Sequence, residues 1–226
     1  TKKVRQITDG STWYSTGGGF DYAWSPDGKW FTLEFTGNKH DPYSDIGLVS
    51  AEGGKDIINL TNSGYMSGYP HFALDGNAIL FTTERYGMRA HASWGSLNDA
   101  MLVFLNQDAY DKYCLSKEDY ELRKELEKEQ KKSAGKDTPQ DKNKDKKKKY
   151  DKKDSNADEK DDQPKDIVVE LKGIEDRVVR LTPNSSDMGS TIISKDGETL
   201  YYLAAFEGGY DLWKMNLRKK ETRLLH

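Results

Sequence analysis

The sequence has 226 residues, with 35 Lys and Arg against 38 Asp and Glu, which gives a net charge of −3. This length fits one large domain or two small ones. The lack of a net positive charge argues against nucleic-acid binding as the main function. A single cysteine, Cys114, excludes an internal disulfide framework and a multi-cysteine metal site. We expect no metal, no cofactor and no membrane span, since no apolar run approaches the roughly 20 residues that a membrane helix needs.

The first element expected in chain order is a short strand at Val4–Thr8. It ends in Ile7-Thr8, and two later strands end in the similar pairs Leu60-Thr61 and Leu181-Thr182. We therefore interpret Val4–Thr8 as the fourth strand of a preceding four-stranded unit.

A hairpin with an Asp-Gly turn then occurs three times along the chain. The turns are Asp27-Gly28, Asp75-Gly76 and Asp196-Gly197, and each lies between two apolar runs. Asp-Gly in this setting predicts a type I′ turn, in which both central residues have positive φ. The first two turns are 48 residues apart, and the longer second interval contains an insertion.

Two further strands are expected after each hairpin. They are Asp45–Ser50 and Asp56–Thr61, then Ala100–Leu105 and Arg177–Thr182, then Tyr210–Leu217 and Glu221–Leu225. Units of four short strands at a period of about 40–50 residues are typical of β-propeller blades. We predict an all-β fold, a partial β-propeller of about three four-stranded blades.

A charged insertion separates the third and fourth strands of the second unit. Residues 116–132 are expected to form an exposed helix, because Ser116 can cap it and Asp119 follows three residues later. Residues 131–165 contain 13 Lys, 9 Asp or Glu and only 3 hydrophobic residues, which predicts disorder. RNA or lipid headgroups are the functional alternative for this Lys-rich run. Because the acids leave a net charge of only +4, we interpret it as a solvated insertion without a nucleic-acid partner.

These observations divide the chain into three parts. Residues 1–110 form the first part of the propeller, and residues 166–226 continue it. Residues 111–165 form the insertion, helical at first and then disordered.

The repeat resembles a known family. Trp24-Ser25-Pro26-Asp27-Gly28-Lys29, followed by an apolar strand, resembles the WD40-like repeat of TolB and of tricorn-type proteases. Residues 83–89 and 174–181 of the second unit look like the N-terminal propeller of tricorn-like serine peptidases of the S41 family.

The resemblance implies a non-catalytic propeller region that guides or filters peptides toward a protease domain absent from this chain. It implies as partners peptides or unfolded protein segments, the remaining blades and catalytic domain of a parent chain, and further copies in a homo-oligomer. The alternative is a TolB-like protein-interaction scaffold with no attached protease. One unpaired cysteine is compatible with either a cytoplasmic or a periplasmic location.

The candidate binding residues follow the second Asp-Gly hairpin. Arg85 and Arg89 could bind a peptide carboxylate in a bidentate manner, and His91 and Trp94 lie in the same predicted loop, where propellers place ligand contacts. The structural alternative is loop packing with an Arg–Asp pair inside the blade. We interpret His71 as a structural histidine. No Gly-x-Ser-x-Gly elbow occurs, and no catalytic residue is assigned.

Overall fold

The structure is a computed structural model that describes residues 3–10, 21–37, 43–54, 56–91, 94–134 and 165–225. For residues 90, 91, 94 and 131–134 it describes the backbone alone. The chain divides into two compact units, Thr1–Cys114 with Lys165–His226, and Leu115–Pro164. The disorder predicted for the Lys-rich run falls mostly on residues 135–164, which lie outside the described residues.

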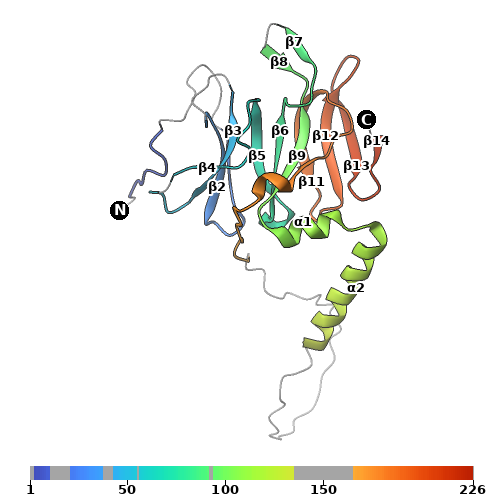
Figure 1. Ribbon diagram of the computed structural model, residues 1–226. Coiled ribbons are helices and arrows are strands. Elements are labelled where there is room, and N and C mark those ends of the chain that lie inside the picture. Colours follow the sequence, from blue (N-terminus) through green and yellow to red (C-terminus); the bar gives the residue numbers. More distant parts are fainter. Residues whose placement is uncertain are drawn as a thin grey trace, which may run out of the picture. The chain divides into compact units, whose positions relative to one another are not determined.

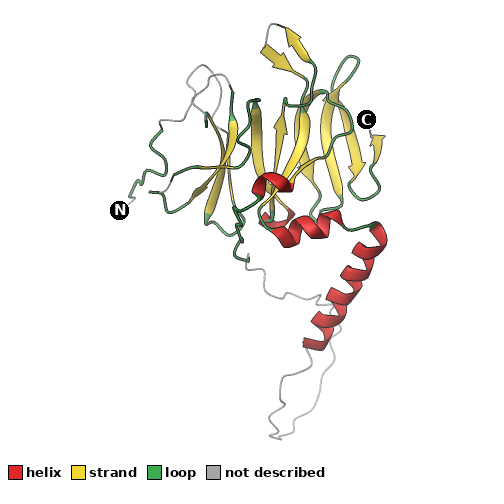
Figure 2. Cartoon of the chain, viewed as in Figure 1, coloured by secondary structure: helices red, strands yellow, loops and turns green. Residues whose placement is uncertain are grey.

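Three four-stranded antiparallel sheets form the first unit (Figures 1 and 2). The first sheet contains, in spatial order, β1 (Tyr22–Trp24), β2 (Trp30–Phe35), β3 (Asp45–Ser50) and β4 (Ile58–Asn59). The second contains β5 (Ser67–Ala73), β6 (Ala78–Thr83), β9 (Asp99–Phe104) and β10 (Val178–Arg180). The third contains β11 (Asp187–Ile193), β12 (Thr199–Ala205), β13 (Asp211–Asn216) and β14 (Glu221–Leu224). The predicted partial propeller is confirmed, with the insertion between β9 and β10.

The three sheets pack face to face through two shared cores. Side chains alternate along a strand, so β6 serves both cores. Ile79 and Phe81 pack with Ile46 and Leu48 of the first sheet. Leu80 packs on the other side, in the core shared with the third sheet. Every residue of β6 and β9 is buried, and each large apolar side chain contributes about 1.5–3 kcal/mol by leaving water.

A leucine directly after β4 and another directly after β10 fill the spaces between neighbouring sheets. Leu60 lies in the core shared by the first and second sheets, and Leu181 lies in the core shared by the second and third. Ile7 packs in the same manner on the free face of the first sheet, against Leu33 and Val49. The prediction of a strand at residues 4–8 is wrong, because none of the strands in the described part of the chain includes this segment, and its Ile7 packs on the face of the first sheet instead.

The three Asp-Gly turns are not of one type. In the second turn Asp75 has φ 54° and Gly76 φ 87°, and Asn77 N donates to Leu74 O at 3.1 Å, which is type I′ geometry. In the first and third turns only the glycine has positive φ, so the type I′ prediction is wrong there. The cause is a serine two residues before the aspartate. Ser25 donates to Asp27 and Ser194 donates to Asp196, both at 2.5 Å, and each hydrogen bond closes a wider loop. The second turn has alanine at this position.

The insertion begins with two helices, of which α1 belongs to the first unit and α2 to the second. Helix α1 (Gln107–Cys114), which was not predicted, places Tyr113 on Phe104 with ring centroids 5.1 Å apart. Helix α2 (Lys117–Ala134) confirms the helix predicted at 116–132. Its predicted cap is present, since Asp119 N donates to Ser116 Oγ at 3.1 Å. Neither helix combines the length and apolar composition that a membrane-crossing helix requires within the described residues.

After the insertion the chain returns along the turns of the first two sheets. Ile167 N donates to Asp27 Oδ2 at 2.9 Å, and a 3₁₀ turn at Ile174–Arg177 leads into β10. Arg177 is only 3% exposed, and its guanidinium donates to three backbone carbonyls, those of Phe104, Lys172 and Glu170. This side chain therefore fixes the returning segment to the end of β9.

Candidate functional site

A small hairpin marks one end of the sheets. It consists of β7 (Arg89–His91) and β8 (Trp94–Ser96), lies between β6 and β9 in the sequence, and extends beyond both strands (Figure 1). Its register pairs Arg89 with Ser96 and His91 with Trp94. We call the loops at this end, residues 62–66, 84–91, 94–98 and 206–210, the hairpin end.

All four predicted binding residues lie in this segment. Arg85 and Arg89 are both exposed, with the Arg85 guanidinium 5.6 Å from the Tyr86 ring and that of Arg89 6.0 Å from the Tyr65 ring. Among the described residues neither arginine forms an ion pair with a carboxylate. His91 and Trp94 are cross-strand partners, and their side chains are not described. The peptide-binding role of the four residues stays a prediction.

The Arg–Asp pair expected inside the blade involves a different arginine. Asp99, fully buried at the start of β9, accepts hydrogen bonds from Arg180 at 2.9 and 3.0 Å and from Thr182 at 2.8 Å. The Arg180 guanidinium also lies 5.0 Å from the Tyr86 ring. A buried carboxylate whose oxygens are occupied by hydrogen bonds in this way has a structural role. By holding Arg180, it positions Tyr86 beside Arg85.

Asp45 makes the equivalent contacts in the first sheet, at the corner where the start of the third strand meets the end of the fourth. Its carboxylate accepts from Thr61 Oγ1 at 2.7 Å, from Asn59 Nδ2 at 2.9 Å and from Ser63 N at 2.8 Å. The sequence signal for both corners is an aspartate that begins the third strand and a Leu-Thr pair that follows the fourth. The corners explain why Leu60 and Leu181 are both followed by threonine.

Two titratable side chains, Glu84 in the hairpin end and His71 on β5, are perturbed by burial. Burial raises the pKa of Glu84, and the positive charge of Arg89 opposes this change. Burial lowers the pKa of His71, whose Nδ1 lies 3.3 Å from the backbone oxygen of Tyr69. His71 is the only histidine with a described side chain, and its hydrogen-bond partner is neither a serine nor a carboxylate. Within the described part of the chain, no three His, Cys, Asp or Glu side chains are arranged to hold a metal ion.

Exposed apolar side chains also gather at or beside the hairpin end. Met88 is 79% exposed and Tyr69 is 66% exposed, and they are accompanied by Tyr86, Phe206 and Tyr210. Sequence reasoning missed this set, because its members come from three segments that only the sheet topology brings together. Exposed aromatic side chains are typical of surfaces that bind peptides or proteins.

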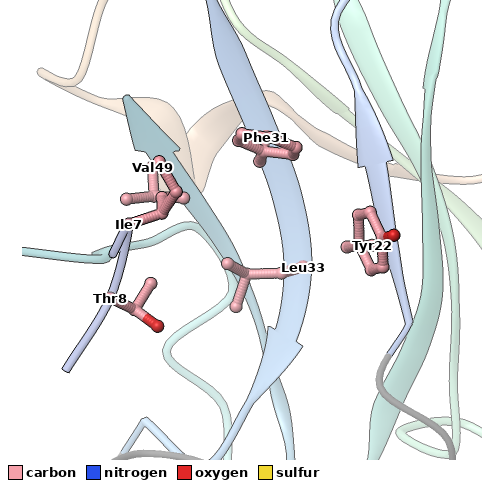
Figure 3. Close-up of a pocket in the computed structure, with 6 residues that line it drawn as sticks. All are labelled: Ile7, Thr8, Tyr22, Phe31, Leu33 and Val49. Carbon is pink, nitrogen blue, oxygen red and sulfur yellow. The ribbon is translucent and has the colours of Figure 1, made fainter. Parts of the chain in front are cut away.

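The free face of the first sheet carries an apolar hollow of about 150 Å³. Figure 3 shows Ile7 and Val49 together on one side of it and Tyr22 on the other, with Phe31, Leu33 and Thr8 completing the lining. Trp24, which is 57% exposed, stacks on Phe31 with ring centroids 3.8 Å apart. The corresponding faces of the second and third sheets are covered by a neighbouring sheet. We therefore interpret the hollow as part of a sheet-packing face rather than as a ligand pocket.

Comparison with known proteins supports the fold. No family model and no curated protein matches the sequence. The crystal structure of tricorn protease is 10% identical, with a TM-score of 0.52 over 90% of this chain and 18% of that chain. TolB from Acinetobacter baumannii is 13% identical, with a TM-score of 0.46 over 91% of this chain and 32% of that chain. A TolB structure from Agrobacterium tumefaciens is 13% identical, with a TM-score of 0.48 over 93% and 50%.

The chain therefore spans half or less of each of these proteins. At such low identity the likeness concerns the fold alone. The likeness to tricorn protease agrees with the topology of the three sheets, which is that of a partial β-propeller.

Proposed function

We propose that this chain is a non-catalytic propeller region that binds peptides or unfolded protein segments at its hairpin end. In this proposal it guides or filters them toward a serine peptidase domain of the tricorn-like type. The observation that carries the proposal is the pair of exposed guanidinium groups, Arg85 and Arg89, which lie beside the rings of Tyr86 and Tyr65. Among the described residues neither forms a salt bridge, although the carboxylate of Glu84 interacts electrostatically with Arg89.

The chemistry of this end suits a peptide carboxylate. A guanidinium group can donate two parallel hydrogen bonds to one carboxylate, which gives both strength and orientation. The rings of Tyr65 and Tyr86 lie next to the two arginines and can pack against the peptide's apolar side chains. The C-terminal carboxylate of a peptide is the simplest group that fits.

The test uses two labelled peptides of one sequence, one with a free C-terminal carboxylate and one amidated, measured by fluorescence anisotropy. We expect the free acid to bind more tightly, and the double variant R85A/R89A to lose about tenfold in affinity, or about 1.4 kcal/mol. The double variant K195A/R223A removes two exposed positive charges elsewhere and is the matched control. Equal binding of the acid and the amide, or equal losses in the two double variants, would contradict the proposal.

A protein-interaction scaffold is the second candidate. The exposed side chains of Tyr86, Met88 and Phe206 favour it, because they offer an apolar surface that suits a folded partner. Retained binding of a folded partner protein, with no binding of the short peptides, would select this alternative.

A further inference from the structure

We infer that Asp187, Tyr69 and Tyr210 form a second recognition site next to the hairpin end, which takes the cationic side chain of an arginine or lysine. The inference deepens the proposed function, since it names a second group on the bound peptide. It relies on that function only for the peptide context, because the site itself can be tested with a small cation.

The carboxylate and one of the rings are held together by contacts that leave both exposed. Tyr210 OH donates to Asp187 Oδ1 at 2.8 Å, across the strand β12 that separates β11 from β13. The Tyr210 ring lies against the backbone of β11 at Gly189, where an added Cβ would sit 3.6 Å from its Cε1. This distance is an ordinary van der Waals contact, so the ring lies close to the strand at this position.

The second ring is supplied by a strained residue of β5. Tyr69 has φ +54°, which a bulky side chain rarely adopts, and it lies in a register shift between Gly68 and His71. The side chain is nevertheless 66% exposed, so packing does not explain the strain. The pKa of Tyr210 is raised chiefly by its hydrogen bond to Asp187, and Tyr69 adds to this change in the same direction. Strain of this kind at an exposed residue points to a functional constraint.

The chemistry of the three groups is that of a cation site. Asp187 has no Lys or Arg partner among the described residues, and its only described hydrogen-bond donor is Tyr210. An arginine side chain can bond to a carboxylate and stack on a tyrosine ring at the same time. The buried carboxylates Asp45 and Asp99 lack this capacity, because their oxygens are already bonded within the blades.

The experiment uses the full chain labelled with 3-fluorotyrosine and followed by ¹⁹F NMR. Tyr69→Phe and Tyr210→Phe assign the two resonances. N-acetyl-arginine amide, which has a guanidinium group and no carboxylate, is the probe, and neutral N-acetyl-glutamine amide is the control. We expect saturable shifts of both resonances with the arginine probe alone, and binding at least about threefold weaker in Asp187→Asn.

Two further variants separate this inference from the proposed function. Asp56→Asn removes an exposed carboxylate far from β11 in the sequence and should leave the titration unchanged. R85A/R89A should also leave it unchanged while weakening binding of the free-acid peptide. The remaining tyrosine resonances report whether each variant is folded. Equal shifts with the neutral amide, no saturable shift, or full binding by Asp187→Asn would overturn the inference, whatever the peptide experiment shows.

Discussion

Single side chains at the junctions between sheets control how closely the sheets approach. Glu34 of β2 is half-buried next to Gly68 of β5, where an added Cβ would lie 2.8 Å from Glu34 Oε2. Burial raises the pKa of Glu34, the negative charge of Asp21 acts in the same direction, and a hydrogen bond with Ser44 opposes both. The ionised form of Glu34 is therefore disfavoured in the folded chain.

This shift makes stability depend on pH. A folded-state pKa above the ordinary 4.5 means that the folded chain binds the proton more tightly than the unfolded chain. The stabilising contribution is complete below pH 4.5 and is lost as the pH rises through the raised value. We expect the free energy of unfolding of the wild type to increase relative to Glu34→Gln when the pH falls from 7 toward 4.5, as measured by urea denaturation. A constant difference, or the same trend in the exposed control Glu52→Gln, would contradict this explanation.

The two proposed recognition sites differ in how far the sequence predicts them. Arg85 and Arg89 could be singled out because they lie in the predicted loop after one hairpin, where propellers place ligand contacts, and because guanidinium groups bind carboxylates. Asp187 and Tyr210 are 23 residues apart on strands that do not pair with each other, and Tyr69 comes from another sheet. No local pattern connects the three, so only the packed structure brings them together.

At the scale of elements, the turn residues carry most of the sequence signal. The Asp-Gly pairs located all three hairpins, although the serine before two of them changes the turn type. The hairpin of β7 and β8 was not predicted, because strands of three residues are too short to show a periodic pattern. The start of helix α1 could have been predicted from Asn106, which is a favoured residue for a helix N-cap. Its Oδ1 accepts a hydrogen bond from Ala109 N at 2.9 Å.

The turn geometry predicts different costs at two glycines. Gly28 has φ +69° and no atom within 4 Å of an added Cβ, so Gly28→Ala should cost about 1 kcal/mol from backbone strain alone. Gly64 also has open space around it but no positive φ, and Gly64→Ala should be neutral or slightly stabilising. Thermal unfolding of the two variants side by side measures the difference. Equal melting temperatures would show that the turn at Gly28 relaxes without strain.

On the scale of the whole molecule, the buried cores belong to one unit. The three core clusters draw all their members from the unit formed by Thr1–Cys114 and Lys165–His226. The other unit, Leu115–Pro164, contributes none of these residues. The charge-rich composition of that segment predicted this separation, since it offers little apolar surface to bury.

Replacement of Leu115–Pro164 tests this separation. A Gly/Ser linker of about 15 residues should leave the melting temperature of the sheets within a few degrees of that of the full chain. Helix α1 is kept, because Tyr110 and Tyr113 pack on Phe104. Circular dichroism at a β-sheet wavelength follows the transition. A drop of ten degrees or more would mean that the insertion stabilises the blades.

The two ends of the sheets also differ in chemistry. One end has the tight Asp-Gly turns and the returning segment, and the other has exposed arginines and aromatic rings. We propose that the second end, the hairpin end, binds peptides. The most direct measurement is photo-crosslinking of a short peptide that has a free C-terminal carboxylate and a benzophenone side chain, with the crosslinked residues mapped by mass spectrometry. We predict crosslinks within residues 62–66, 84–91, 94–98 and 206–210, reduced in R85A/R89A. Crosslinks concentrated at the Asp-Gly turns, or spread evenly over the chain, would contradict the claim.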